Sequence, residues 1–338
     1  MGASAFNYVQ YGKETNNGTA VAATKRWPGT WQKLPSDVKK VEVEEMMDVR
    51  AAARRTRADQ KLFRSSLISP NATFQQLIPV FGCGLKGGVT ATETTPAQGD
   101  YDWAFTPAVT TTSNAPDSLT VELGNSEESE CREVEYCMFD KITIGGSIDQ
   151  EGGECPVNVE ASFFGRQLSD VTKTAAIGQP SGTFMNAKKA RLYLDTSWAG
   201  VGGTEIANLL RSFQIEILTG LIPDATGSAN EYFNAHKESI FGIMGTFTIE
   251  GGSNAWTIFD NARSAGLVVA RLKVVGPQIG SGVNHQLQID FSGDYMEVSP
   301  LDSDDRGRNL ATFAVNGLYD PTGAKLLQCG LITDTNAY

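Results

Sequence analysis

Residues 140–168 read DKITIGGSIDQEGGECPVNVEASFFGRQL, and this stretch decides the fold class. Its second limb, VNVEASF at 157–163, alternates apolar with polar side chains. A period of two places the apolar side chains on one face of a strand and the polar ones on the other. The two limbs flank a turn rich in glycine and acidic residues. The stretch therefore predicts a hairpin with one buried face and one polar face.

Similar alternating segments recur along the chain, separated by Gly, Pro, Asn and Asp. They read YDWAFTP, SLTVELG and REVEYCMFDKITIGG in the first half, and ARLYLDTS, RSFQIEIL, MGTFTIEGG, GLVVARLKVVG, HQLQIDFSGDYMEVSP and NLATFAVNGLYD in the second. Two segments predict short helices: NATFQQLIPVFGCGL, which Pro79 and the glycines should end, and TIFDNARSAG. TEIANLLRSF fits either a helical turn or an extended segment. The sequence therefore predicts a mainly β protein of sandwich or barrel-like domains with short flanking helices.

The length of 338 residues favours two domains. Residues 1–37 are polar and contain the turn signals NNGTA and RWPGTW, which predict an extended N-terminal arm. A polar segment of small residues, 173–186, predicts a linker between a first β domain at 38–172 and a second at 187–338, which includes a C-terminal tail. Both halves contain a strand, an acidic loop and an alternating strand that ends in Gly. This shared pattern suggests duplication of one unit.

Composition excludes several classes of protein. The net charge of −11 and the pI of about 4.8 argue against general affinity for nucleic-acid backbone. Five cysteines without a CxxC pair predict reduced, buried thiols in a product made in the cytoplasm, with a Cys131–Cys155 or Cys137–Cys155 bridge as the alternative. The opening residues lack the features of a signal peptide, and no apolar run approaches the roughly 20 residues of a membrane helix. We therefore expect no membrane association.

No motif predicts a catalytic, cofactor-binding or metal-binding residue. GCGLKG, at 82–87, matches a dinucleotide fingerprint but lacks the strand before it and the helix after it. LDSDDRGRN, at 301–309, begins like a calcium loop, but Arg306 and Phe313 stand where ligands are needed. His236 and His285 have no nucleophile motif beside them. A carboxylate-based glycan hydrolase is kept as an alternative, because acidic residues on strands can act in pairs.

The N-terminal segment FNYVQYGKETNNGTAVAATKRWPGTW resembles the opening of siphovirus-type bacteriophage major tail tube proteins. Their pattern G-x-E-T-x-x-G-T-A-V-A spans Gly12 to Ala22 here. PDSLTVELG, KITIGGSID with VNVEASFFG, and KKARLYLD are similar to later segments of that family, so the likeness covers most of the chain. The resemblance implies a structural protein of the virion tail that is synthesised in the host cytoplasm, with no enzymatic activity and no cofactor.

The resemblance also implies partners. Family members assemble into stacked rings through which double-stranded DNA passes, and they contact tape measure, tail terminator and tail-tip proteins. Six copies with one tube domain close a ring, or three copies with a duplicated domain. Length and the weak repeat favour the trimer here, and the hexamer is the alternative. A baseplate or other minor tail protein is the competing function.

Two sets of residues follow from this interpretation. Unpaired strand edges invite strands of neighbouring copies, which leaves the polar sheet face to line the lumen. Acidic residues there would repel the DNA backbone. The candidate lumen acids are Asp149, Glu151, Glu160, Asp290 and Asp294. A basic run at 50–64 fits phosphate binding, a solvated and partly helical segment or, as we prefer, contact with an acidic neighbour. The candidate contacts between copies are Trp27, Trp31, Arg54, Arg55, Arg57, Arg306 and Arg308.

Overall fold

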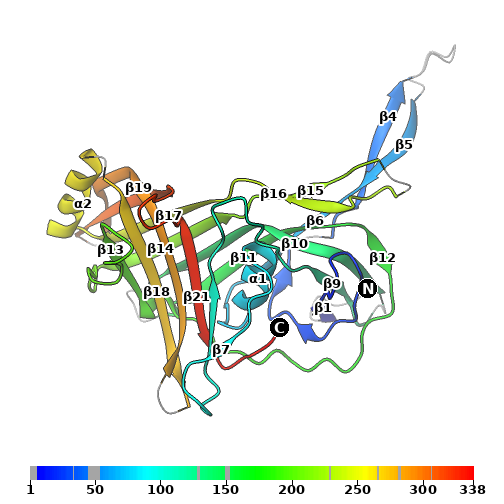
Figure 1. Ribbon diagram of the computed structural model, residues 1–338, viewed down its shortest axis with the longest axis horizontal. Coiled ribbons are helices and arrows are strands. Elements are labelled where there is room, and N and C mark those ends of the chain that lie inside the picture. Colours follow the sequence, from blue (N-terminus) through cyan, green and yellow to red (C-terminus); the bar gives the residue numbers. More distant parts are fainter. Residues whose placement is uncertain are drawn as a thin grey trace.

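The structure is a computed structural model that describes residues 6–32, 34–44, 54–127, 130–148, 153–227, 230–264, 266–280, 283–305 and 307–338. These residues form antiparallel sheets with two α-helices, which confirms the predicted mainly β class (Figure 1). Within these ranges no helix is both long enough and apolar enough to cross a membrane.

The first half of the chain contains β1 (Asn7–Lys13), β2 (Lys25–Arg26), β3 (Thr30–Trp31), β4 (Val38–Glu44), β5 (Arg54–Lys61), β6 (Phe63–Ser69), α1 (Leu77–Gly84), β7 (Thr92–Glu93), β8 (Tyr101–Phe105), β9 (Leu119–Asn125), β10 (Glu130–Ser147), β11 (Val157–Gly165) and β12 (Leu168–Asp170). The second half contains a 3₁₀ turn (Ala187–Lys189), β13 (Ala190–Asp195), β14 (Leu210–Leu218), β15 (Leu221–Asp224), β16 (Ala235–Glu238), β17 (Gly242–Glu250), α2 (Ser253–Arg263), β18 (Val268–Ile279), β19 (Val283–Asp305), β20 (Arg308–Gly317) and β21 (Leu327–Thr333).

Two long strands, β10 and β19, each belong to two sheets. The first part of β10 pairs with β9 and β12, and its later part pairs with β11 and β14. Between these parts Tyr136 has a φ of 57°, and the register shifts. The first part of β19 pairs with β18 and β21, and its later part pairs with β20. Glu297, with a φ of 51°, lies where the register of β19 shifts. Bends of this kind let one strand cross between layers.

The pairings define one large sheet and two side sheets. The large sheet has the order β3-β6-β11-β10-β14-β17-β20-β19. The first side sheet is β2-β1-β9-β10-β12, and the second is β13-β18-β19-β21-β8-β7. The pairings of the described strands never return to their starting strand, so these strands form no closed barrel.

The strand pairings show that the two halves of the chain have the same topology. In unit 1, β1 pairs with β9, β9 and β12 flank the first part of β10, and β3-β6-β11 leads to its later part. The same pairings recur in unit 2 in the same chain order. There β13 pairs with β18, β18 and β21 flank the first part of β19, and β14-β17-β20 leads to its later part. Each unit also has a helix after its second large-sheet strand, β6 or β17, and a two-stranded hairpin, β4-β5 or β15-β16. Only β2, β7 and β8 lack a counterpart among the described strands.

The two units are not separate bodies. The later part of β10 pairs with β14 over seven residue pairs, from Lys141↔Leu218 to Ser147↔Ser212. This contact makes one large sheet from four strands of each unit. The helix α1 is buried along its whole length and contacts β10, β8 and β21 (Figure 1). One hydrophobic core accordingly runs from Val9 to Leu331.

Several local predictions need correction. The arm predicted at 1–37 is wrong for β1 to β3, because β1 pairs along its whole length with β9 and Val9 is buried. Pro79 does not end α1. It lies in the first helical turn, where its missing N–H costs no hydrogen bond. The ambiguous segment TEIANLLRSF contributes its end to the strand β14. The basic run has no helix over 54–61, where it forms the strand β5. All five cysteines are free and buried, so the alternative of a disulfide is wrong.

The motif Gly12 to Ala22 has a structural explanation in Glu14. This buried carboxylate accepts hydrogen bonds from the Gly18 and Tyr136 N–H groups at 2.6 and 2.8 Å, and from the hydroxyls of Thr120, at 3.0 Å, and Ser118. Gly18 has a φ of 81°, which favours glycine. Glu14 therefore links the N-terminal turn to β9 and to the bend of β10.

We expect Glu14→Ala to lower the free energy of unfolding by about 3 kcal/mol, because it leaves buried donors without an acceptor. Urea denaturation followed by circular dichroism measures this change. The control Glu154→Ala alters an exposed carboxylate and should change stability by less than about 0.5 kcal/mol. Equal stability of the two variants would contradict the role assigned to Glu14.

Candidate assembly surfaces

The large sheet ends in two open edges. At one end β3 pairs with β6, and no other described strand lies on its far side. At the opposite end the stretch 294–305 of β19 pairs with β20, again with no described strand on its other side. The equivalent stretch of β10 has β11 on one side and β14 on the other. Open edges present unpaired N–H and C=O groups that can accept a further strand.

One face of the large sheet packs on the core, and the other is polar. The core face carries Ile142, Ile144, Ala161, Phe163, Ile215, Ile217, Phe247 and Phe313. Cross-strand pairings define one row on the opposite face: Ile68, Glu160, Thr143, Glu216, Met244, Asn316 and Asp294. Glu160 and Asp294 were both predicted to line a lumen, and they belong to this single row, one in each unit. Both side chains are partly exposed.

The polar face is less acidic than the net charge suggests. Lys141 lies 2.8 Å from Glu216, and Arg64 forms an ion pair with Asp140. Glu160 has no ion-pair partner among the described residues. The acidic character of this face therefore rests on a few carboxylates, chiefly Glu160 and Asp294.

The structure removes Asp290 from the predicted lumen residues. Its side chain is 2% exposed and lies on the second side sheet. Two hydrogen bonds of 2.7 and 2.8 Å join its carboxylate to Arg271, and Gln288 donates a third. A buried carboxylate in such a pair cannot present its charge to a channel. Asp149 and Glu151 lie outside the described residues.

The predicted contacts between copies have different outcomes. Trp27 is buried inside the chain, so that prediction is wrong. Trp31 is only partly buried, and it lies on the open edge strand β3. Arg308 is exposed and lies 3.7 Å from Glu250 of the same chain. Arg54, Arg55 and Arg57 lie on β5, but their side chains are not described, and Arg306 is outside the described residues.

Unit 2 covers part of unit 1 through the β15-β16 hairpin. Leu221 and Phe233 of this hairpin pack on Tyr136, Met138 and Phe164 of β10 and β11. The Phe233 ring lies 5.1 Å from the Tyr136 ring and 5.6 Å from the Phe164 ring. All five side chains are nearly or completely buried. The hairpin therefore forms a small second core over the bend of β10.

Arg166 connects this second core to the N-terminal turn through hydrogen bonds. Its guanidinium donates hydrogen bonds to the carbonyls of Gly18 at 2.8 Å, Phe233 at 3.1 Å and Asn234 at 3.2 Å. It also lies over the Tyr136 ring, 4.7 Å from the centroid. One side chain thus connects the N-terminal turn, the bend of β10 and the hairpin of unit 2. Sequence reasoning missed Arg166, because none of its partners is nearby in the sequence.

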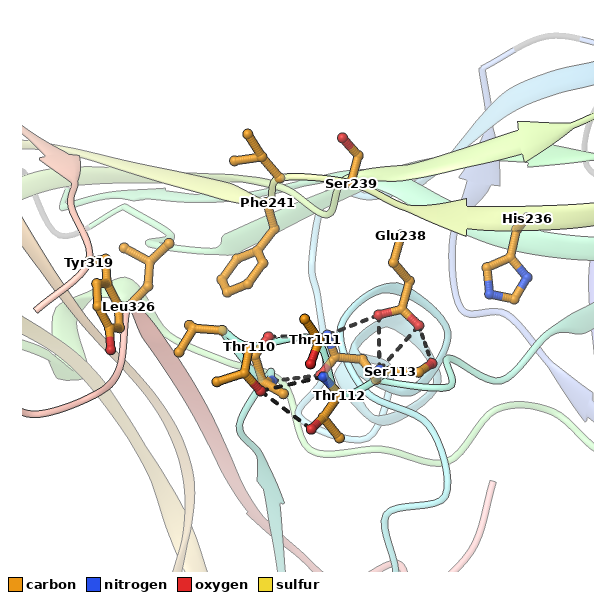
Figure 2. Close-up of a pocket in the computed structure, with 14 residues that line it drawn as sticks. Thr110, Thr111, Thr112, Ser113, His236, Glu238, Ser239, Phe241, Tyr319 and Leu326 are labelled. Carbon is orange, nitrogen blue, oxygen red and sulfur yellow. Dashed lines mark hydrogen bonds between the residues drawn. The ribbon is translucent and has the colours of Figure 1, made fainter. Parts of the chain in front are cut away.

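A cavity of about 840 Å³ lies between the two units beside this hairpin (Figure 2). Its walls come from residues 108–114, the end of β16, Phe241, Tyr319 and Leu326. In Figure 2 the Glu238 carboxylate points at the loop that contains Ser113, and the His236 ring lies apart from it.

Glu238 connects β16 to this loop through several hydrogen bonds. It accepts hydrogen bonds from the Asn114 and Ala115 N–H groups, the Asn114 amide and the Ser113 hydroxyl. His236 instead contacts the Tyr136 hydroxyl at 3.1 Å, and burial lowers the pKa of its imidazole. Among the described residues, His236 therefore has no hydrogen bond to a hydroxyl that lines the cavity. The Glu238 contacts were also missed, because a lone strand-end carboxylate has no sequence signature.

The other sequence motifs lie in structural positions. Gly82 and Gly84 of GCGLKG belong to the end of α1, and a side chain at Gly82 would collide with the Tyr338 hydroxyl. LDSDDRGRN spans the end of β19 and the start of β20, as expected for a hairpin connection. The His285 ring stacks on Phe74 and contacts Thr183. Within the described ranges no three His, Cys, Asp or Glu side chains gather as metal ligands.

We expect the 113–115 loop to loosen as the pH falls. Burial alone would raise the pKa of Glu238, but the hydrogen bonds from Ser113, Asn114 and Ala115 hold it below the usual value. The stabilisation should therefore be present above the unfolded pKa of about 4.3 and should be lost as the pH falls through the lower folded value. Hydrogen exchange of the Asn114 amide, corrected for intrinsic rates, measures this loss.

The variant Glu238→Gln provides the control, because it cannot ionise and should remove the pH dependence. The Ile144 amide, in the centre of β10, reports global unfolding in the same samples. Loop protection that falls only together with protection of Ile144 would contradict a local role for Glu238.

Comparison with known proteins finds no protein-family model and no curated protein that matches this chain.

Proposed function

We propose that the protein is a structural component that assembles side by side with copies of itself into rings, and that it serves as a bacteriophage tail tube protein. The observation that carries the proposal is the pairing of β10 with β14, which joins two units of the same topology edge to edge. The resemblance of the N-terminal segment to tail tube proteins supplies the biological context.

The pairing of β10 with β14 inside one chain predicts how strands of two neighbouring copies pair. The later part of β19 is the counterpart of the later part of β10, and β3 is the counterpart of β14. If β19 of one copy pairs with the segment that contains β3 in the next copy, every unit has the same neighbours. Such a contact joins two different surfaces and must either close a ring or extend as a filament. Two units per chain make three copies equivalent to six units, which supports the trimer.

The polar face of the large sheet supports a role as a channel lining. Assembly through the two edges would join these faces into one continuous inner or outer surface. Its serine, threonine and carboxylate side chains offer few fixed cations to DNA phosphates, and Lys141 and Arg64 are paired with acids. A wall of this kind would let double-stranded DNA pass with little binding. Passage of DNA, location in the virion tail and contacts with tape measure, terminator and tip proteins are all part of the proposal.

Electron microscopy of the purified chain tests the proposal directly. We expect rings or stacked tubes with a central channel, and top views should show six similar lobes built from three copies. A protein that stays monomeric at every concentration and salt level would refute self-assembly. Rings present in only a few copies per virion would favour the competing function, a baseplate or minor tail protein.

The open edge of β19 can be tested with Leu301→Lys. Leu301 is 58% exposed on this edge strand, and a lysine there hinders addition of a further strand. We expect the association constant, measured by analytical ultracentrifugation, to fall by about tenfold or more, or roughly 1.4 kcal/mol. Leu218→Lys is the matched control: Leu218 is 50% exposed, but its strand β14 already has partners on both sides. An equal effect of both variants would argue against the β19 edge.

A further inference from the structure

The two hairpins of the chain occupy equivalent places in their units but have different surroundings. The β15-β16 hairpin connects β14 to β17 and lies over β10 and β11 of unit 1. The β4-β5 hairpin connects β3 to β6 in the same way, but it projects from the molecule (Figure 1). The β15-β16 hairpin of unit 2 therefore packs on a surface of unit 1, which we call the receiving surface. The β4-β5 hairpin of unit 1 does not pack on the equivalent surface of unit 2 within the same chain.

The equivalent receiving surface on unit 2 can be located residue by residue. ASFFGRQL at 161–168 aligns with ATFAVNGL at 311–318. The alignment agrees with the structure, because Ser162 contacts Ser66 and Thr312 contacts Thr248 through the same hydroxyl pairing across the sheet. Met138 then corresponds to Met296, since Met138 pairs with Phe164 and Met296 with Ala314.

Exposure differs sharply between these counterparts. Met138 is 0% exposed beneath the β15-β16 hairpin, whereas Met296 is 52% exposed. Leu62, at the rim of the second core, corresponds to Met244, which is 41% exposed. Unit 2 thus presents an apolar surface, defined by Met244 and Met296, at the place where unit 1 is covered.

Charge identifies which hairpin fits this surface. The strands β4 and β5 contain six basic residues and three acidic ones. The stretch 294–305 of β19, next to the apolar surface, contains five acidic residues and no basic one. The corresponding stretch of β10, at 136–147, has one acid and one base, and the strands of the hairpin that covers it contain two acids and one base. Opposite charge therefore directs β4-β5 to unit 2.

We infer that the β4-β5 hairpin of one copy packs over Met296 and the neighbouring apolar surface of unit 2 in the adjacent copy. This contact would repeat between chains what β15-β16 does within one chain. The inference rests on the side-by-side assembly proposed above, because only that assembly brings the hairpin of one copy beside β19 of another. According to this inference, the basic β4-β5 hairpin contacts a neighbouring copy in the same ring.

Oxidation of methionine by hydrogen peroxide tests the inference on the full chain. The exposed thioether of Met296 should react readily in the monomer, and its rate should fall to that of buried Met138 on assembly. Sedimentation of the same samples reports assembly independently. Assembled protein in which Met296 reacts as fast as in the monomer would overturn the inference and leave the proposed function intact. Failure to assemble would overturn both.

A chain with a shortened hairpin shows which segment covers Met296. Replacing residues 40–59 with Asn-Gly leaves a tight turn between Lys39 and Gln60, which pair in the hairpin. Assemblies of this variant should keep the sheet contact but leave Met296 reactive. Protection of Met296 in the shortened variant would show that another segment covers it and would refute our assignment.

Cross-linking answers the same question if the shortened chain does not assemble. The full chain with Lys40→Cys and Met296→Cys should give a ladder of linked copies with a short bis-maleimide, because both positions are exposed and the native cysteines are buried. High salt should weaken the ladder. The control pairs Lys40→Cys with Ala199→Cys, another exposed position. A ladder of equal strength in the control, or none in the test variant, would contradict the inference.

Discussion

The seven antiparallel residue pairs between β10 and β14 are the contact on which the rest of the structure depends. They join two units of equal topology into one eight-stranded sheet and enclose a single core. The same contact explains why α1 is buried, since strands of both units surround it. It also leaves each outer strand of the sheet without the neighbour that its internal counterpart has. The self-assembly that we propose would satisfy those edges, because each copy carries the matching strand.

Continuity of the large sheet requires β10 to bend, and polar contacts hold the bend. Glu14 accepts a hydrogen bond from the N–H of Tyr136, the residue with a left-handed backbone conformation. Arg166 lies over the ring of the same residue and binds the carbonyls of the hairpin that covers it. The N-terminal motif that resembles tail tube proteins is therefore built around a structural carboxylate. Through Glu14, this motif connects the N-terminal turn to the bend of β10, the strand that pairs with β14 of unit 2.

Most of the secondary structure could be predicted from local patterns, because burial of one face leaves a period of two in a strand. VNVEASF forms β11, and its apolar residues lie in the core as expected. Individual burial was harder to predict. Trp27 and Asp290 are both buried in this chain, because Trp27 packs in the core and Arg271 of the neighbouring strand binds the Asp290 carboxylate. The duplication, visible in sequence only as a vague pattern, becomes clear when the strand pairings are compared.

The amino-acid sequence by itself determined that this protein is mainly β, where many of its strands and both described helices lie, and which face of strands such as β11 is polar. These properties depend on side chains close together in the chain. Only the tertiary structure decided that Lys141 pairs opposite Leu218, that Arg166 joins the two units, and that Met296 is left uncovered where Met138 is buried. The physical reason is that backbone hydrogen bonds between strands are the same for every residue type. A sequence pattern can therefore indicate a strand edge, but the choice of its neighbour depends on how the whole chain packs.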